Sequence, residues 1–291
     1  MKDLKVKISV VTTVFFSLLF LAAVVSAQNF KTAVLPVEET GKNFQAKFRT
    51  ELAKQNFVQL IDNDLSLSAS RALNYKTLFN LSLEESRNLG AAIDCEFFFV
   101  VKSDTVRRSS FKKDVYFESF ANIFLVSARS GRLVSWESIT HEADKAEFAE
   151  NNLLANADKI AARFAIKLQN AAAREREERG TAIKVKTFLE ISDAATPEKE
   201  NIRTPLPYRS LKPAYTEAAA RYEVEAAVEI SVELNVAGAV ENAEIVRWAG
   251  FGLDEETIET VRKMQFRPAL RDGGAIPVRF ALRYNFRRPR P

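Results

Sequence analysis

Residues 228–236 read VEISVELNV and residues 278–286 read VRFALRYNF, and these two stretches decide the fold of the C-terminal part of the chain. In both, apolar and polar residues alternate with a period of two, which predicts strands that bury one face and expose the other. Gly238 ends the first alternation, and glycine readily adopts the positive φ of a tight hairpin turn. A second strand is therefore expected from about Val240 to Arg247, with a bulge where the alternation slips at Asn242-Ala243.

A short helix is expected between the second and third strands. Asp254 can cap its first turn, Glu255 and Glu256 oppose the positive end of the helix dipole, and Pro268 ends the element. A helical crossover makes the strands on either side of it parallel. The third strand therefore runs antiparallel to the first and can lie beside it, as one edge of a three-stranded antiparallel sheet.

This strand order faces Glu229 and Glu233 of the first strand toward Arg279 and Arg283 of the third. Cross-strand pairs of opposite charge contribute roughly 0.2–1 kcal/mol each. The charges therefore favour this pairing without fixing it, and they leave the third strand as an open edge.

Three motifs of the same region resemble the C-terminal domain of TonB-family energy transducers: Lys212-Pro213-Ala214-Tyr215, Gly250-Phe251-Gly252-Leu253-Asp254 and Phe266-Arg267-Pro268-Ala269, together with the hairpin Gly238. The resemblance covers about Pro205 to Phe286. It departs from the family pattern just before the first strand, where Glu223 and Ala226 stand in place of glycines. The resemblance implies a periplasmic ββαβ domain that binds an extended peptide of an outer-membrane receptor.

Residues 30–170 predict a second domain in which strands and helices alternate. One helix should begin at Ser82, and a single closing helix is expected from about Ala143 to Gln169. The motifs Ala33-Val34-Leu35-Pro36 and Leu89-Gly90-Ala91 weakly resemble periplasmic α/β domains of the CsgG and TolB N-terminal type. The fold class is therefore α+β, with an N-terminal mixed α/β sandwich and a C-terminal ββαβ domain. Strands of the first domain are expected at Thr32–Val37, Phe57–Ile61, Glu96–Lys102, Tyr116–Ala128 and Leu133–Ile139.

The first residues have the pattern of a secretory leader. Three lysines precede an apolar run from Ile8 to Ala27, and Val25-Ser26-Ala27 fits a signal-peptidase site. The alternative is a retained inner-membrane anchor facing the periplasm, because the run is long enough to cross a bilayer. The run lacks the Ser-x-x-x-His that the resemblance implies for coupling to a proton-driven motor, since His141 is the only histidine.

The predicted organisation has four segments. Residues 1–27 are the leader or anchor and residues 28–170 the α/β domain. Residues 171–204 form a charged helix end and a linker, whose strand-like part, 183–191, can add one edge strand. Residues 205–291 form the TonB-like domain.

Composition and charge exclude several classes of function. The net charge is +4 at pH 7, and the leader and the terminal arginines hold most of the excess, so a nucleic-acid partner is not expected. Zinc sites need several His or Cys ligands, and this chain has only His141 and Cys95. Cys95 precedes three phenylalanines and is expected to be a buried thiol rather than a nucleophile. We therefore expect no enzyme activity, no cofactor and no metal.

Two functions stay open. In the first, the edge strand captures an extended peptide of an outer-membrane receptor by backbone hydrogen bonds. In the second, the chain is an envelope assembly or scaffolding protein whose N-terminal domain carries the partner site, while the sheet edges pair two protomers as a homodimer. Membrane contact is expected only if the leader is retained. The site residues of the first function are Val278, Arg279, Phe280, Ala281, Leu282, Arg283, Tyr284 and Asn285.

Overall fold

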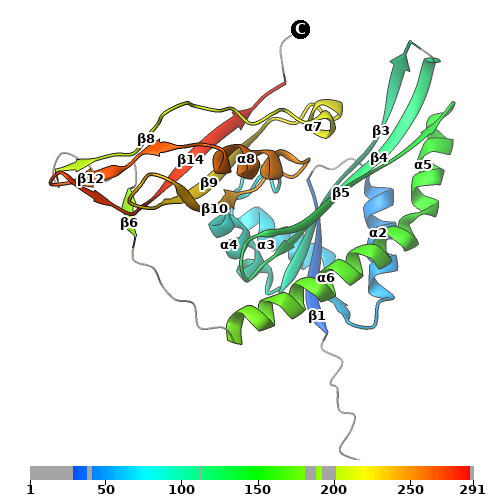
Figure 1. Ribbon diagram of the computed structural model, residues 1–291. Helices are drawn as coiled ribbons and strands as arrows, with labels where there is room; N and C mark the ends of the chain where they lie inside the picture. Colours follow the sequence, from blue (N-terminus) through cyan, green and yellow to red (C-terminus); the bar gives the residue numbers. More distant parts are fainter. Residues whose placement is uncertain (1–28, 38–40, 112, 181–187, 192–200, 289–291) are drawn as a thin grey trace, which may run out of the picture.

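The computed structural model describes residues 29–37, 41–111, 113–180, 188–191 and 201–288. The leader or anchor predicted at 1–27 lies outside these residues, as does most of the predicted linker. None of the described helices combines the length and the apolar character needed to cross a bilayer. The described chain forms an N-terminal unit of helices on a sheet and a C-terminal unit built on a second sheet (Figure 1).

The N-terminal sheet has five strands in the order β2-β1-β3-β4-β5. β1 pairs in parallel with β2 and β3, whereas β3, β4 and β5 are antiparallel neighbours, which confirms the predicted mixed sheet. The β3–β4 hairpin is long and extends beyond the helices (Figure 1). The strands are β1 (Phe30–Pro36), β2 (Val58–Leu60), β3 (Phe97–Ser110), β4 (Lys113–Ser127) and β5 (Leu133–Ala143).

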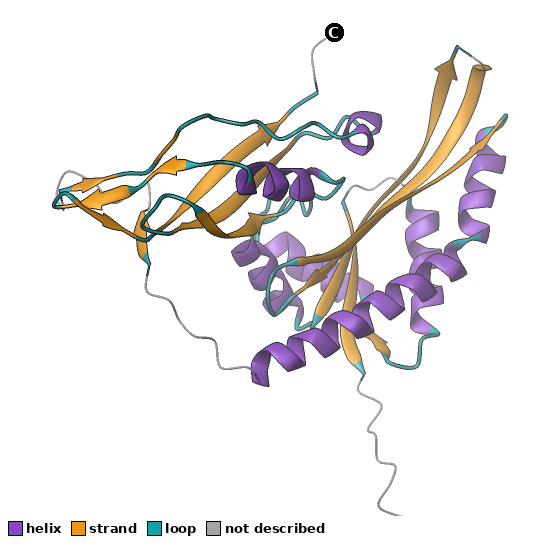
Figure 2. Cartoon of the chain, viewed as in Figure 1, coloured by secondary structure: helices purple, strands orange, loops and turns teal. Residues whose placement is uncertain are grey.

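Helices cover this sheet on both faces (Figure 2). On the first face Phe48 and Phe164 pack edge to face on Phe99, with ring centroids 5.3 and 5.6 Å away. On the second face α4 begins at Ser82, whose side chain forms a capping box with Glu85, as the sequence predicts. The first face carries α2 (Lys42–Ala53), α5 (Ala146–Ala155) and α6 (Ala157–Gly180), and the second carries α3 (Asn63–Ala72) and α4 (Leu83–Ile93).

The prediction of a single closing helix from about Ala143 to Gln169 is wrong. Ala143 still belongs to β5, and the helical segment is divided between α5 and α6 at Asn156, which adopts φ −100° and ψ 1°. The Asn156 side chain donates to the carbonyl oxygen of Asn152 at 2.9 Å. Asparagine favours such local backbone bonds over a continuing helix, so the chain turns here before α6 runs on to Gly180.

The C-terminal sheet has the order β10-β9-β14-β6. β9 pairs antiparallel with both β10 and β14, so the predicted strand order and the ββαβ arrangement are confirmed. The predicted charge pairs also form, with 2.6 Å from Arg279 Nη2 to Glu233 Oε1 and from Arg283 Nη1 to Glu229 Oε1. A register shift between Val240 and Asn242 supplies the predicted bulge. The strands are β6 (Leu189–Ile191), β9 (Ala226–Leu234), β10 (Val240–Arg247) and β14 (Val278–Phe286).

Several local features of this unit differ from the prediction. The crossover helix α8 (Leu253–Arg262) ends well before Pro268, and Gly252 rather than Asp254 is its N-cap residue. The sheet has four strands rather than three, because β6, within the strand-like stretch 183–191, adds the edge strand that this stretch was expected to allow. Elements that the sequence did not predict are the helix α7 (Glu217–Arg221) and the short strands β7 (Ile202–Arg203), β8 (Leu206–Pro207), β11 (Phe266–Arg267), β12 (Ala269–Arg271) and β13 (Gly274–Ile276).

One hydrophobic core joins the two units. It contains Phe98 and Phe124 from the N-terminal sheet together with Trp248 and Phe251 from the segment between β10 and α8. The rings of Phe124 and Trp248 stack with centroids 5.7 Å apart. Gly250 has φ +68°, and a Cβ atom there would lie 2.6 Å from the Phe124 ring. The glycine motif therefore serves the junction of the two units as well as the turn.

Candidate functional site

The edge strand predicted as the peptide site is β14, and its open part is shorter than predicted. β6 pairs in parallel with Val278, Arg279 and Phe280, so the prediction of an open edge is wrong for these three residues. The reason lies in residues 189–191, which return from the linker and add the fourth strand. Among the described residues no strand pairs with the outer side of 281–286.

The backbone direction along β14 shows which residues face the open side. The carbonyl oxygen of Pro277 accepts a hydrogen bond from the N–H of Leu189, so the backbone groups of Pro277 point toward β6 and away from β9. Backbone groups alternate in direction along a strand. The N–H and C=O groups of Ala281, Arg283 and Asn285 therefore point outward at the open edge.

The side chains of this edge differ between the two faces of the sheet. Ala281, Arg283 and Asn285 are exposed, and Arg283 is held by Glu229 of the neighbouring strand. Leu282 and Tyr284 are half-buried on the other face, where they extend the core beneath α8. A strand added here would meet polar side chains on one face and apolar ones on the other.

The opposite edge of the sheet, β10, meets the N-terminal unit. Arg247 forms an isolated backbone bridge with Ser82, and the N–H of Trp248 donates to the carbonyl oxygen of Leu81 at 3.3 Å. Glu244 accepts from Nε of Arg132 at 2.9 Å. Contacts with the first unit therefore hold this edge, in contrast to the outer half of β14.

Asn80 holds the two units together, and the sequence did not indicate this role. Its Nδ2 donates to the carbonyl oxygens of Ala227 and Trp248 at 2.7 and 2.6 Å, and its Oδ1 accepts from the N–H of Ala227 at 2.9 Å. Its backbone has φ 61°, a region that asparagine tolerates better than most residues. An asparagine in a turn between two helical stretches was the available indication, but its partners lie more than 140 residues away.

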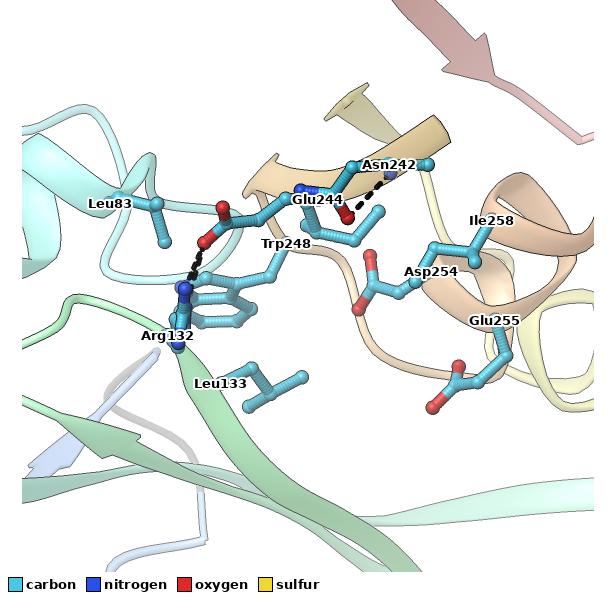
Figure 3. Close-up of a pocket in the computed structure, with 11 residues that line it drawn as sticks. Leu83, Arg132, Leu133, Asn242, Glu244, Trp248, Asp254, Glu255 and Ile258 are labelled. Carbon is cyan, nitrogen blue, oxygen red and sulfur yellow. Dashed lines mark hydrogen bonds and ion pairs between the residues drawn. The ribbon is translucent and has the colours of Figure 1, made fainter. Parts of the chain in front are cut away.

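A hollow of about 430 Å³ lies between the two units (Figure 3). Arg132 reaches Glu244 on one side of it, and Asp254 projects from α8 on the other. Asp254 accepts from the N–H groups of Ala249 and Gly250, both at 2.8 Å. Burial raises the pKa of the Asp254 carboxyl to about 7, against the opposing effect of those two bonds. The carboxyl thus fixes the loop that carries Phe251 into the shared core.

The two residues that could carry catalytic chemistry, His141 and Cys95, lie in different segments of the N-terminal unit. His141 lies on β5, with Nε2 3.4 Å from the amide nitrogen of Asn156. Cys95 is half-buried, and burial raises the pKa of its thiol to about 12, so the thiol stays protonated at neutral pH. Within the described ranges no three His, Cys, Asp or Glu side chains are grouped as metal ligands. Trp136 and Trp248 both pack in or against the shared core, as predicted.

Comparison with protein families gives one match. Residues 212–287 match the model of the Gram-negative bacterial TonB protein C-terminal family, in agreement with the resemblance inferred from the motifs. No curated protein matches the chain.

Several solved structures are similar in part. The solution structure of the Pseudomonas aeruginosa TonB C-terminal domain is 16% identical, with a TM-score of 0.27, over 36% of this chain and 99% of that one. The lipoprotein GNA1162 from Neisseria meningitidis is 10% identical, with a TM-score of 0.32, over 47% of this chain and 98% of that one. The LpoB C-terminal domain from Salmonella enterica is 11% identical, with a TM-score of 0.28, over 42% and 88% of the two chains.

Proposed function

We propose, from the match of residues 212–287 to the TonB C-terminal family, that this chain is a periplasmic binding protein for an extended segment of an outer-membrane transport receptor. The segment binds by strand addition at residues 281–286 of β14. The observation that carries this proposal is the outer side of that half-strand, which no strand of the described residues pairs with and where three residues direct backbone donors and acceptors outward.

The side chains around the edge define the peptide that fits. An added strand would place alternate residues beside Leu282 and Tyr284 on the same face of the sheet, which favours apolar side chains at those positions. On the other face it would lie beside Arg283 and Asn285, which favours polar or acidic side chains. An extended segment with apolar and polar residues in alternation is the expected ligand.

We propose no catalytic role for the chain. The matched family is not an enzyme family, and the protonated Cys95 thiol is a poor nucleophile. The periplasm is the proposed location, because the matched family is of the bacterial cell-envelope type.

The test places a photo-crosslinking amino acid at Asn285 of the full chain in cells and identifies the adduct by mass spectrometry. We expect the N-terminal segment of an outer-membrane receptor to be attached. The same amino acid at exposed Lys76, which lies in the N-terminal unit, is the control site and should not give that adduct.

A matched pair of variants tests the backbone contribution. Ala281→Pro removes an outward N–H without touching the bonds to β9, so it should abolish the receptor adduct, whereas Ala281→Val keeps the N–H and should retain it. Adducts with a second copy of the chain, or a receptor adduct that survives in Ala281→Pro, would overturn the proposal. The first result would instead favour protomer pairing through the sheet edge.

A further inference from the structure

A second cavity lies between the two units, and nothing in the proposed function uses it. It has a volume of about 440 Å³, within the usual range for small-molecule sites. Strands β3 and β4 form its floor, and residues 221–225, at the C-terminal end of α7 and just after it, form a wall with Phe251. Both units therefore contribute to it.

Asn122 marks the floor of this cavity. In β4 it stands between Phe120 and Phe124, and all three side chains line the cavity. Asn122 is only 1% exposed, and within the described part of the chain neither its amide oxygen nor its amide nitrogen has a hydrogen-bond partner. Almost all buried polar groups are satisfied, because leaving one unpaired lowers folding stability. An apolar residue would give a more stable fold at this position, so the presence of the amide indicates that it binds a ligand.

The walls of the cavity are aromatic and rigid. The Tyr222 ring lies 4.9 Å from that of Phe120 and 5.8 Å from that of Phe251, measured between centroids. The Tyr222 hydroxyl accepts a hydrogen bond from the Ser138 hydroxyl at 2.8 Å, which fixes the ring. A ligand that reaches Asn122 must therefore carry an apolar body.

Charges beside the cavity neutralise one another. Buried Glu118 binds Arg108 at 3.2 Å and Arg221 at 3.1 Å. The lining itself carries three positive side chains, Lys102, Arg108 and Arg221, and three negative ones, Asp104, Glu223 and Glu225. The site therefore offers no excess charge to a charged ligand, and burial in this apolar setting disfavours one.

We infer that the cavity binds a small neutral carboxamide carried on an apolar group. A carboxamide supplies one C=O acceptor and one N–H donor side by side, which match Nδ2 and Oδ1 of Asn122, two atoms with no partner among the described residues, as a pair of hydrogen bonds. The apolar group fills the space between the aromatic walls. This site is independent of the β14 edge.

The test compares two probes that differ in one group. 3-Phenylpropanamide has the amide and methyl 3-phenylpropanoate lacks its N–H donor. With the full chain, isothermal calorimetry and saturation-transfer NMR should give the amide a dissociation constant of about 1 mM or below. The ester should bind at least about tenfold more weakly, since it leaves the Asn122 oxygen unpaired.

Asn122→Leu is the decisive variant, because leucine is close to asparagine in volume and removes only the polar atoms. It should keep or raise Tm and lose the preference for the amide over the ester. Ala281→Pro should bind the amide as the wild type does. Failure of the amide to bind the wild type, equal binding of the two probes, an amide preference retained in Asn122→Leu, or a marked fall of its Tm would each overturn the inference.

Discussion

Asn80 shows how one side chain can join two distant parts of a chain. Its three side-chain hydrogen bonds all end on the C-terminal unit, and its carbonyl oxygen accepts a fourth from Arg247 Nη1 at 2.7 Å. Its positive φ adds a requirement on the backbone. The residue therefore couples a local turn conformation to the docking of β9 and β10.

We expect Asn80→Ala to lower the free energy of unfolding by about 2–4 kcal/mol, because it removes three hydrogen bonds, leaves a partner N–H unpaired and strains the turn. Urea denaturation of the full chain measures the change. Asn80→Gly loses the same bonds but accepts the positive φ, so it should be less damaging than alanine.

Asn74 provides the matched control for this prediction. It has φ 53° and is exposed, so Asn74→Ala should cost only the backbone strain, about 1 kcal/mol. Equal losses for Asn74→Ala and Asn80→Ala would show that the bonds between the units contribute nothing to stability.

At the scale of elements, the sequence predicted the strands that alternate and missed those that do not. VEISVELNV and VRFALRYNF have a period of two and a helical crossover between them, so the order of β10, β9 and β14 and the facing of β9 glutamates by β14 arginines could be inferred. The strand β6 falls within the strand-like stretch 183–191 that was expected to add an edge strand, but the five strands of the small sheets, which were missed, are only two or three residues long. So few residues show no periodicity, and only tertiary contacts make them strands.

The candidate site could also be predicted only in part. Alternation identified β14 as a sheet edge, but only the fold shows that β6 occupies its first three residues. Asn122 is the one polar residue in the apolar run 120–126 of β4, and the sequence cannot distinguish it from an asparagine with a partner. Asp254 was expected to cap its own helix, and instead its carboxyl binds the preceding loop, because Gly252 starts the helix two residues earlier.

The Arg279–Glu233 pair tests the register of β14 on β9. A double-mutant cycle with Arg279→Ala and Glu233→Ala should give a favourable coupling of up to about 1 kcal/mol. The coupling should fall at high salt, because Arg279 is partly exposed. The pair Lys263–Glu259 on α8 is exposed on both sides and should show a smaller coupling. A zero coupling at low salt would contradict a stabilising role for the pair.

At the level of the whole molecule, the two units are joined through one shared hydrophobic core. Phe124, Trp248 and Phe251 belong to a single buried cluster, and ion pairs such as Arg132–Glu244 and Arg221–Glu118 cross the junction. Neither unit keeps its apolar surface buried without the other. Unfolding one unit therefore removes part of the core of the other.

We expect the full chain to unfold in a single urea transition. Tryptophan fluorescence, which reports on Trp136 and Trp248 at the junction, and far-UV circular dichroism, which reports on both units, should have the same midpoint. Two separate transitions, or different midpoints for the two probes, would show that the units are independently stable.

The shared core also determines how the TonB-like unit can be studied in isolation. A truncated protein starting at residue 205 would lack β6 and β7, which pair with β14 and β12, and would carry Trp248 and Phe251 uncovered on its surface. Such a fragment would expose an aromatic surface patch and a longer unpaired strand edge, both of which promote aggregation and nonspecific binding. We therefore expect pull-downs with this fragment to recover proteins that do not bind the full chain.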